Sequence, residues 1–259
     1  MKFSIIINTH NQKKYLKDTI KTCLLQNFNS YEILIIDTSD RKFDNLPKNK
    51  KLKYYYIKKK YSQPELNQLH KILFGLKKSK GDYILLMDGD DKFKKNKLIY
   101  LNKLINAKKI KINQDLPLIE YVKKNKTKIL KVKKYKRFKI FQRYINQWPQ
   151  IYGTSSILIY SNILKKFFKK AKPFNWPLLA IDVQLLIFCS IFFKISYFGE
   201  TLTTKKIHNN NLGEKYLSIF KKIFWIRRKM QYEYYFFLLK KRFFTLDYAI
   251  TKLIYSIIK

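Results

Sequence analysis

The sequence contains few of the residues that mark flexible, cross-linked or membrane-spanning chains. Glycine and proline number only six each in 259 residues, which excludes collagen-like sequence and argues against long flexible linkers. The two cysteines, Cys23 and Cys189, lie far apart in apolar stretches, so we expect reduced residues of the core. The apolar stretch from Leu185 to Phe193 is far shorter than the roughly 20 residues of a membrane span. Met1 and Lys2 lead directly into a strand-like pattern rather than a signal peptide, so we expect a cytoplasmic protein.

Acidic residues are also scarce, because 17 Asp and Glu stand against 56 Lys and Arg, a formal net charge of +39. Such a charge favours anionic partners, including nucleic acids, phospholipid surfaces and nucleotide diphosphates. Only six of the basic residues are arginine, the residue that makes most bidentate contacts with phosphates and bases. No arginine-rich patch or nucleic-acid-binding module is visible. The abundance of Lys, Ile, Asn, Tyr and Phe is typical of A/T-rich codons, and we expect no nucleic-acid partner.

The first half of the chain alternates strand-like and helix-like segments. Short apolar runs rich in β-branched residues predict buried strands, and apolar residues at helical spacing predict amphipathic helices. The expected strands are 3–8, 32–37, 52–57 and 83–87, and the expected helices are 13–26, 65–79 and 96–108. Strands that alternate with helices favour an α/β fold with a parallel, doubly wound sheet, and ligands of such sheets bind along the edge where the strands end.

The second half is less regular. Residues 110–150 have the pattern of strands or loops with many lysines, and 151–160 form another β-branched run. Helices are expected at 162–169 and 179–193. Residues 215–259 interleave aromatic, Leu and Ile residues with Lys and Arg at helical spacing. This last pattern fits two structures, a pair of helices on a membrane surface or an α-hairpin that closes the core.

The segment with the clearest chemistry follows the expected strand at 83–87. Asp88, Asp90 and Asp91 lie within four positions, with Gly89 between the first two. Carboxylates this close repel one another unless their pKa values rise or a cation neutralises them. Mg²⁺ and Mn²⁺ prefer such oxygen ligands and also bind diphosphates, and Gly89 permits a close approach to a ligand. The alternative is a solvated acidic turn that caps the helix at 96–108.

Three segments, in order and spacing, resemble the motifs of the GT-A-fold glycosyltransferases of family 2. Residues 4–11 are similar to the family's opening strand and its Pro-Thr-Tyr-Asn turn, and residues 32–40 to its Asp-Asp-Gly-Ser strand end. Residues 75–84 are similar to the segment that leads into the family's D-x-D turn. Later segments fit the family's acceptor half, namely 153–156, 176–182 and His208. Motifs in this order are more specific than any one of them alone.

The resemblance covers about residues 3–210 and implies a GT-A architecture. We expect a glycosyltransferase domain at 1–210, a mostly parallel sheet flanked by helices, followed by a basic-aromatic helical tail at 211–259. Within the domain, 1–108 would be the nucleotide-sugar-binding half and 109–210 the acceptor half.

The resemblance also implies a donor site for a nucleotide diphosphate sugar, with UDP as the default nucleotide, and a divalent Mn or Mg ion. The residues expected to bind the nucleotide sugar are Thr9, His10, Asn11, Asp37, Ser39, Asp88, Gly89 and Asp90. The expected metal ligands are Asp88, Asp90 and His208. A surface histidine in a loop is the alternative for His208.

On the acceptor side, the resemblance implies that Asp182 is the catalytic base and that Thr154 and Trp176 bind the acceptor. The implied reaction is an inverting transfer to a saccharide or lipid-linked acceptor in cell-envelope polysaccharide synthesis, with 215–259 able to hold the protein on the inner face of the plasma membrane. Asp182 as a helix cap and Trp176 as a core residue are the alternatives.

The chain departs from the family pattern at several positions. Asn8 replaces the usual proline, and His10 replaces a common tyrosine. Asp37 is a single Asp where the family often has two, and Leu73 occupies a position that is often Asn. Ile181 replaces the Glu of the family's acidic pair. Ile181 and His10 support the first alternative, a catalytically inactive homologue that acts as a membrane-associated scaffold. A basic nucleic-acid-binding protein is the less favoured alternative.

Overall fold

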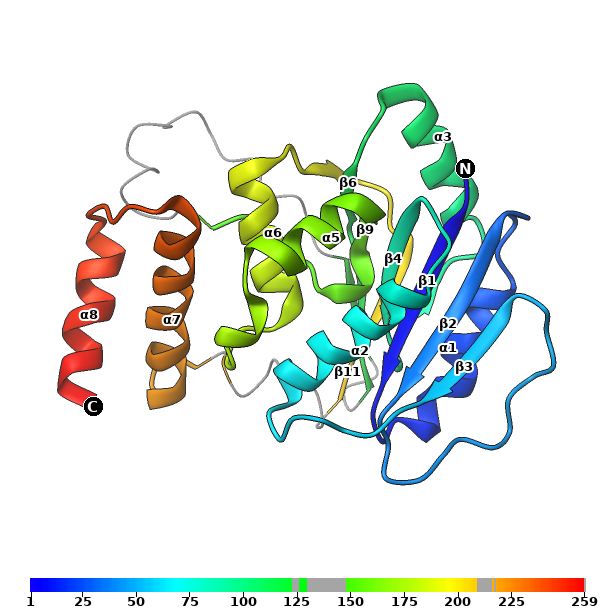
Figure 1. Cartoon of the computed structure of the whole chain (residues 1–259), viewed down its shortest axis with the longest axis horizontal. Coiled ribbons are helices and arrows are strands. Elements are labelled where there is room, and N and C mark those ends of the chain that lie inside the picture. The colour runs from blue at the N-terminus through cyan, green and yellow to red at the C-terminus, as the bar shows by residue number, and fades with distance from the viewer. Residues whose placement is uncertain (123–125, 130–147, 209–215, 217, 259) are drawn as a thin grey trace.

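The structure is a computed structural model that describes residues 1–122, 126–129, 148–208, 216 and 218–258. Within these residues the chain forms a seven-stranded sheet, a smaller four-stranded sheet and a C-terminal pair of helices (Figure 1). Helices cover both faces of the large sheet. The α/β class expected from the sequence, with helices on both faces of a mostly parallel sheet and a C-terminal helical extension, is confirmed.

The large sheet is mostly parallel. Its strand order is β10-β6-β9-β4-β1-β2-β3, and β9 runs antiparallel to both of its neighbours. Strand β1 is buried along its whole length because both faces of the sheet are covered, which explains its continuous apolar sequence. The strands are β1 Phe3–Thr9, β2 Tyr31–Asp37, β3 Leu52–Tyr56, β4 Tyr83–Asp88, β6 Ile112–Asp115, β9 Ile157–Tyr160 and β10 Ser196–Phe198.

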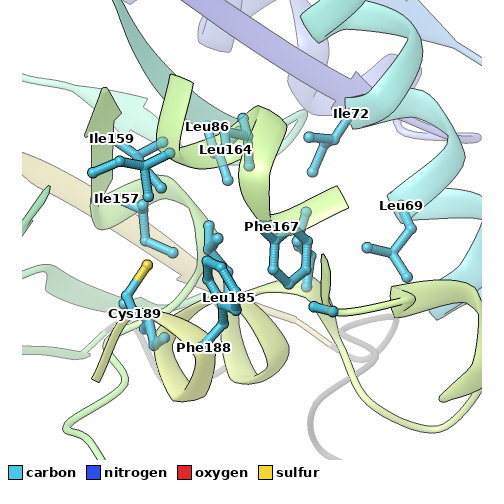
Figure 2. Packing of buried hydrophobic residues seen from close by; sticks show 14 of the residues in the cluster. Leu69, Ile72, Leu86, Ile157, Ile159, Leu164, Phe167, Leu185, Phe188 and Cys189 are labelled. Carbon is cyan, nitrogen blue, oxygen red and sulfur yellow. The ribbon is translucent and has the colours of Figure 1, made fainter. Parts of the chain in front are cut away.

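Two apolar clusters hold helices on the opposite faces of this sheet. Helices α1 (Lys13–Leu24) and α3 (Lys97–Lys108) pack on one face, and α2 (Pro64–Lys78), α5 (Ser161–Lys170) and α6 (Ile181–Phe192) on the other. Successive strand side chains point to opposite faces, so alternate residues of β1 and β2 enter alternate clusters. Figure 2 shows Leu69, Ile72, Phe167 and Phe188 gathered in the second cluster.

The order of the strands determines where a ligand can bind. The chain runs from β1 outward through β2 and β3, and then returns through α2 to place β4 on the other side of β1. Such a reversal opens a crevice at the carboxyl ends of the two central strands. Asn8 of β1 and Asp88 of β4 are register partners at this end of the sheet.

The small sheet connects the acidic turn, residues 88–91, to the second half of the chain. Strand β11 (Thr203–Ile207) pairs with β5 (Lys92–Phe93), which follows the acidic turn, and β11 leads directly into His208. The other two strands are β7 (Leu118–Tyr121) and β8 (Lys126–Ile129). A buried ion pair between Lys97 and Asp115, with 2.8 Å between Nζ and Oδ1, ties α3 to β6, and Lys97 also donates a hydrogen bond to Thr203 of β11.

The described residues of 110–150 agree with the expected pattern, and 151–160 differ in detail. Residues 110–150 contain the short strands β6, β7 and β8, and 130–147 lie outside the described residues. The strand expected over 151–160 is shorter, because Gly153 adopts a φ of 106° and starts a single 3₁₀ turn at Thr154–Ser156. Only 157–160 then joins the sheet.

The described part of the expected tail forms two helices, α7 (Lys222–Leu239) and α8 (Leu246–Ile258). Helix α7 packs against α6. Tyr234 of α7 is fully buried, and its hydroxyl donates a hydrogen bond of 2.9 Å to the Gln184 carbonyl. The α-hairpin of the sequence analysis is therefore present, and its first helix is part of the core. In the described part of the chain, no helix combines the length and apolar character needed to cross a membrane.

Candidate active site

A cavity of about 1140 Å³ opens at the carboxyl ends of β1 and β4. Its walls come from the ends of both strands, from α1 and α2, from the start of α6, from the end of β11 and from α7. Typical ligand pockets measure roughly 300–1,000 Å³. The cavity therefore has room for a nucleotide sugar and part of an acceptor together.

Asp88 lies at the floor of the cavity. Its Oδ1 accepts hydrogen bonds from the amide groups of Asn8 (2.8 Å) and Gln68 (3.0 Å). Burial, followed by the nearby charge of Asp90, raises the pKa of Asp88 to about 6. The mutual repulsion expected from the sequence is thus present, and a cation bound beside these carboxylates would relieve it.

Asp91 and Gly89 hold the turn in place. Asp91 is 2% exposed, and its carboxylate accepts hydrogen bonds from the Ser155 hydroxyl (2.6 Å) and the Lys206 backbone N–H (2.9 Å). A Cβ at Gly89 would stand 2.7 Å from Thr9 Oγ1. Glycine is required here because the turn packs against the end of β1. Of the described residues, those that line the cavity do not include Gly89.

Asp90 and His208 meet in the cavity. The distance between Asp90 Oδ2 and His208 Nε2 is 2.8 Å, and Asp90 is 4% exposed. The His208 ring stacks on Tyr15, with 4.9 Å between ring centroids, and this contact fixes the plane of the imidazole. The structure thus joins two of the three predicted metal ligands.

The residues present fit a divalent ion in part. Among the described residues, no group of three or more His, Cys, Asp and Glu side chains could hold a metal alone. Mg²⁺ is usually held by one or two carboxylates together with substrate phosphates and water. Asp90 and His208 can supply two ligands of this kind, and a donor diphosphate would supply others. Asp88 is less available as a metal ligand than Asp90, because its Oδ1 already accepts hydrogen bonds from two side-chain amides.

Residues of the turn after β1, predicted to bind the donor, line one side of the cavity. His10 and Asn11 line it, and both are tied to the turn after β2. His10 Nδ1 lies 2.7 Å from the Thr38 carbonyl oxygen, and the Asn11 backbone N–H donates to Ser39 Oγ at 2.7 Å. Asn11 adopts a left-handed conformation with a φ of 53°, which asparagine tolerates better than most residues.

Thr9, Asp37 and Ser39 lie beneath the cavity wall rather than on it. Asp37 is 1% exposed and accepts hydrogen bonds from the Ser39 hydroxyl (2.5 Å) and the Tyr54 hydroxyl (2.8 Å). Of the described residues, the lining does not include these three. The structure therefore places the predicted base-binding Asp37 inside the protein, where it shapes the turn that carries His10 and Asn11.

Lys71 is a cavity residue that sequence reasoning missed. It is 4% exposed, and its ammonium group donates a hydrogen bond of 2.9 Å to the Thr9 carbonyl. Burial lowers its pKa to about 8, against the opposing charges of Asp88 and Asp37. The sequence contained one signal for this position. Gln68 and Lys71 are polar and three residues apart, so they lie on the same side of the helix expected at 65–79, next to its apolar face.

Asp182 and Thr154, predicted to serve the acceptor, line the same cavity. Asp182 lies in the first turn of α6 and lines the cavity. Its charge contributes to the raised pKa of Asp88, so the two carboxylates face a common space. Asp182 Oδ1 also accepts a hydrogen bond from the Val183 backbone N–H at 2.8 Å, which orients the carboxylate at the helix start. Thr154 is buried and also lines the cavity.

Trp176 packs on helix α7. Its ring contacts the rings of Tyr234 and Phe237, with centroid distances of 5.3 and 5.7 Å. The cavity lining, within the described part of the chain, does not include Trp176. Its position corresponds to the core residue that the sequence analysis left as the alternative.

Helix α7 contributes a cationic wall that the sequence did not indicate. Arg227 and Arg228 line the cavity together with Lys205 of β11. The Arg227 guanidinium lies 4.3 Å from the centre of the Tyr216 ring, which holds it at the cavity surface. Arg228 binds both carboxylate oxygens of Asp247, each at 2.7 Å. A cavity with carboxylates on one side and guanidinium groups on the other can bind a cation and a diphosphate together.

Comparison with known proteins gives the family. The model of glycosyl transferase family 2 matches residues 4–168, more than half of the chain. The chain belongs to glycosyl transferase family 2. The match includes Thr154 but ends before Asp182, His208, Lys205 and α7, so these residues lie outside it.

Two relatives that are described as glycosyltransferases match part of the chain. The chain is 33% identical to an uncharacterized glycosyltransferase of Rickettsia conorii over 38% of its length, and 29% identical to one of Haemophilus influenzae over 37%. It spans only 16% and 38% of the lengths of these two relatives.

Solved structures are similar over the whole chain. S. aureus TarS 1–349 in complex with UDP-GlcNAc has a TM-score of 0.58 at 14% identity, covering 100% of this chain and 71% of that one. The mannosyltransferase PcManGT of Pyrobaculum calidifontis in complex with GDP-Man and Mn²⁺ has a TM-score of 0.57 at 8% identity, covering 98% and 69%. At these identities the similarity shows the fold alone, which is the GT-A-like architecture expected from the sequence.

Proposed function

We propose that the protein is an inverting glycosyltransferase that moves a sugar from a nucleotide diphosphate sugar to a hydroxyl group of a glycan or lipid-linked acceptor. One observation carries the proposal: the Asp90–His208 pair and Asp182 open into the same cavity at the ends of β1 and β4. Support also comes from solved relatives of the same fold, which bind UDP, UDP-GlcNAc or GDP-Man. UDP is the default nucleotide.

In this proposal the donor lies between the acidic turn and the cationic wall. Asp90 and His208 would hold a Mn²⁺ or Mg²⁺ ion, which when bound supplies Lewis-acid stabilisation of the departing diphosphate. Arg227 and Lys205 place positive charge beside the same diphosphate. His10 and Asn11 contact the nucleotide from the turn after β1.

Asp182 acts as the general base in this scheme. Its carboxylate takes the proton of the acceptor hydroxyl while that oxygen forms a bond to the anomeric carbon. The bond between the anomeric carbon and the diphosphate oxygen breaks on the opposite face, so the configuration inverts. The nucleoside diphosphate leaves with the bonding electrons, and Asp182 returns its proton to water.

The cellular role in the proposal is cell-envelope polysaccharide synthesis, with the protein in the cytoplasm at the inner face of the plasma membrane. A glycan or lipid-linked acceptor would enter past Asp182 and Thr154, the acceptor side of the cavity. Thr154 would bind the acceptor, whereas Trp176 would act through its contacts with α7.

A thermal-shift panel tests the proposal. UDP, GDP, CMP and dTDP compounds, each with and without Mn²⁺, are added to the full chain, because a ligand that binds the native state raises its melting temperature. We expect a shift for one nucleotide that depends on the metal and disappears in Asp90→Ala. A folded protein with no shift for any compound would favour the catalytically inactive scaffold instead.

A further inference from the structure

The outer face of α8 carries an apolar stripe. Its side chains recur at intervals of four, three and four residues, so they lie within about 60° of one another around the helix. The stripe consists of Leu246, Ile250, Leu253 and Ile257, which are 57%, 44%, 63% and 75% exposed. Phe244, just before the helix, is 71% exposed. We call these four helical residues the α8 stripe.

The opposite face of α8 is occupied by packing against α7. Tyr248 packs on Tyr232 and Phe236, with ring centroids 5.0 Å apart in each case. Lys229 lies 4.7 Å from the centre of the Tyr255 ring, and Arg228 binds Asp247. Figure 1 shows α8 as the outermost helix, with α7 between it and α6. The α8 stripe therefore faces away from the protein.

Basic residues border the stripe where α8 begins. Lys240, Lys241 and Arg242, the basic loop, are all exposed and are followed by Phe243 and Phe244. Lys252 is also exposed on α8, about 100° around the helix from Leu253. A helix with exposed apolar residues on one side and Lys and Arg around them is typical of segments that lie in the interface of a membrane.

We propose that the α8 stripe and the basic loop dock the protein on an anionic phospholipid membrane. The positive charge of the protein favours an anionic membrane, rather than a second copy of the chain, as the partner that covers the stripe. Two copies joined through the stripe would bring together two chains that each carry a formal net charge of +39, and these like charges repel. An anionic lipid surface attracts the same cations while its acyl boundary accepts the apolar side chains.

The docked orientation does not block the cavity from α8, because α7 separates the two. Arg227 and Phe224 of α7 line the cavity, and other α7 side chains such as Tyr232 and Phe236 contact α8. The proposal is independent of the chemistry in the cavity, and its readout is vesicle binding rather than sugar transfer.

The test is co-sedimentation of the full chain with vesicles. We expect binding to phosphatidylcholine vesicles that contain about one-third phosphatidylglycerol, weak binding to pure phosphatidylcholine, and partial loss of binding at high salt. Leu253→Gln with Ile257→Gln should weaken binding about tenfold or more. Both side chains are exposed, so the melting temperature should stay unchanged. Leu25→Gln with Ile129→Gln, at residues of 51% and 56% exposure elsewhere, is the matched control.

A second pair of variants separates the basic loop from the overall charge. Replacing Lys240, Lys241 and Arg242 by Gln should reduce binding to anionic vesicles several-fold more than the same change at Lys42, Lys48 and Lys50, three exposed lysines far along the chain. Equal losses would show adsorption by charge alone and would overturn the proposal.

A fluorophore reports which side chains enter the lipid. Cys23 and Cys189 are fully buried, so a polarity-sensitive probe on Ile257→Cys would label the stripe selectively. We expect a blue shift on anionic vesicles, and no shift for the probe on Leu25→Cys. No vesicle binding by the wild type, no shift at Ile257→Cys, or a dimer that Leu253→Gln with Ile257→Gln converts to a monomer would each contradict the membrane proposal.

Discussion

Asp90 and His208 are separated by 118 positions in the chain, and their side chains meet with 2.8 Å between Oδ2 and Nε2. The strand pairing between β5 and β11 produces this contact, because it brings the residues after the acidic turn beside the segment that ends at His208. A carboxylate oxygen and an imidazole nitrogen at one point form a natural pair of ligands for Mn²⁺.

The first prediction concerns this pair. Asp90→Asn and His208→Ala should each weaken binding of the nucleoside diphosphate in the presence of Mn²⁺ by at least about tenfold, because each removes one metal ligand. Isothermal titration calorimetry measures the change, and Asp44→Asn, at an exposed carboxylate, is the control. With EDTA present, wild type and variants should bind equally weakly. A variant that lost the same affinity with EDTA as with Mn²⁺ would show a role other than metal binding.

The second prediction concerns Lys71 and pH. Its folded-state pKa of about 8 lies below the ordinary 10.5, so between these values the unfolded chain binds more protons than the folded one, and stability rises with pH. The difference corresponds to about 3 kcal/mol. Relative to Lys71→Met, the free energy of unfolding of the wild type should therefore increase by up to that amount from pH 8 to pH 10.5.

Urea unfolding at several pH values measures this difference. Lys77→Met, at an exposed lysine of the same helix, should show no such dependence. If wild type and Lys71→Met kept the same difference in stability at pH 8 and pH 10, the buried ammonium group would not have the lowered pKa.

The third prediction separates packing from acceptor binding at Trp176. Trp176→Ala should lower the free energy of unfolding by about 3 kcal/mol, because it removes the contacts with Tyr234 and Phe237. Trp176→Phe should restore most of this stability, since the indole N–H has no hydrogen-bond partner among the described residues. Urea unfolding and the KM for the acceptor are measured in parallel. A raised acceptor KM in Trp176→Phe at unchanged stability would support direct acceptor binding instead.

The fourth prediction concerns the buried ion pair below the site. Lys97 and Asp115 are each 1% exposed, and Thr203 donates to Asp115 Oδ2 at 2.7 Å. Lys97→Met should destabilise the fold by about 3–5 kcal/mol, because it leaves a buried carboxylate without its cation. Adding Asp115→Leu should recover much of the loss. A double-mutant cycle by urea unfolding measures the coupling, and a single-variant cost below about 1 kcal/mol would contradict this role.

The sequence was sufficient for the elements that have a clear periodicity. Strands β1, β2 and β4 are continuous apolar runs, and α1 and α2 carry apolar residues on one face, so both kinds of element were predicted within a few residues of their bounds. The acidic turn at the end of β4 was also predictable, because three carboxylates directly follow a buried strand. His208 was predicted as a metal ligand only from the family resemblance, because no local sequence pattern links it to Asp90.

Residues whose environment depends on distant contacts could not be predicted. Asp37 turns inward because the Tyr54 hydroxyl, 17 positions later, binds its second oxygen. Arg227 faces the cavity because α7 packs against both α6 and α8, and a helix with aromatic and basic residues on every side gives no signal of which face is buried. The antiparallel β9 likewise follows from pairing with β4 and β6 rather than from its sequence.

The central claim is tested most directly by the turnover of Asp182→Asn. With the donor identified by thermal shift and Mn²⁺ present, release of the nucleoside diphosphate is measured for the wild type and the variant, with a cell-envelope extract as the acceptor source. We predict wild-type release that falls by about 10²–10⁴-fold in Asp182→Asn, while donor affinity stays unchanged, because only the general base is lost. Near-wild-type release by Asp182→Asn, or no release by a wild type that binds the donor, would contradict the account.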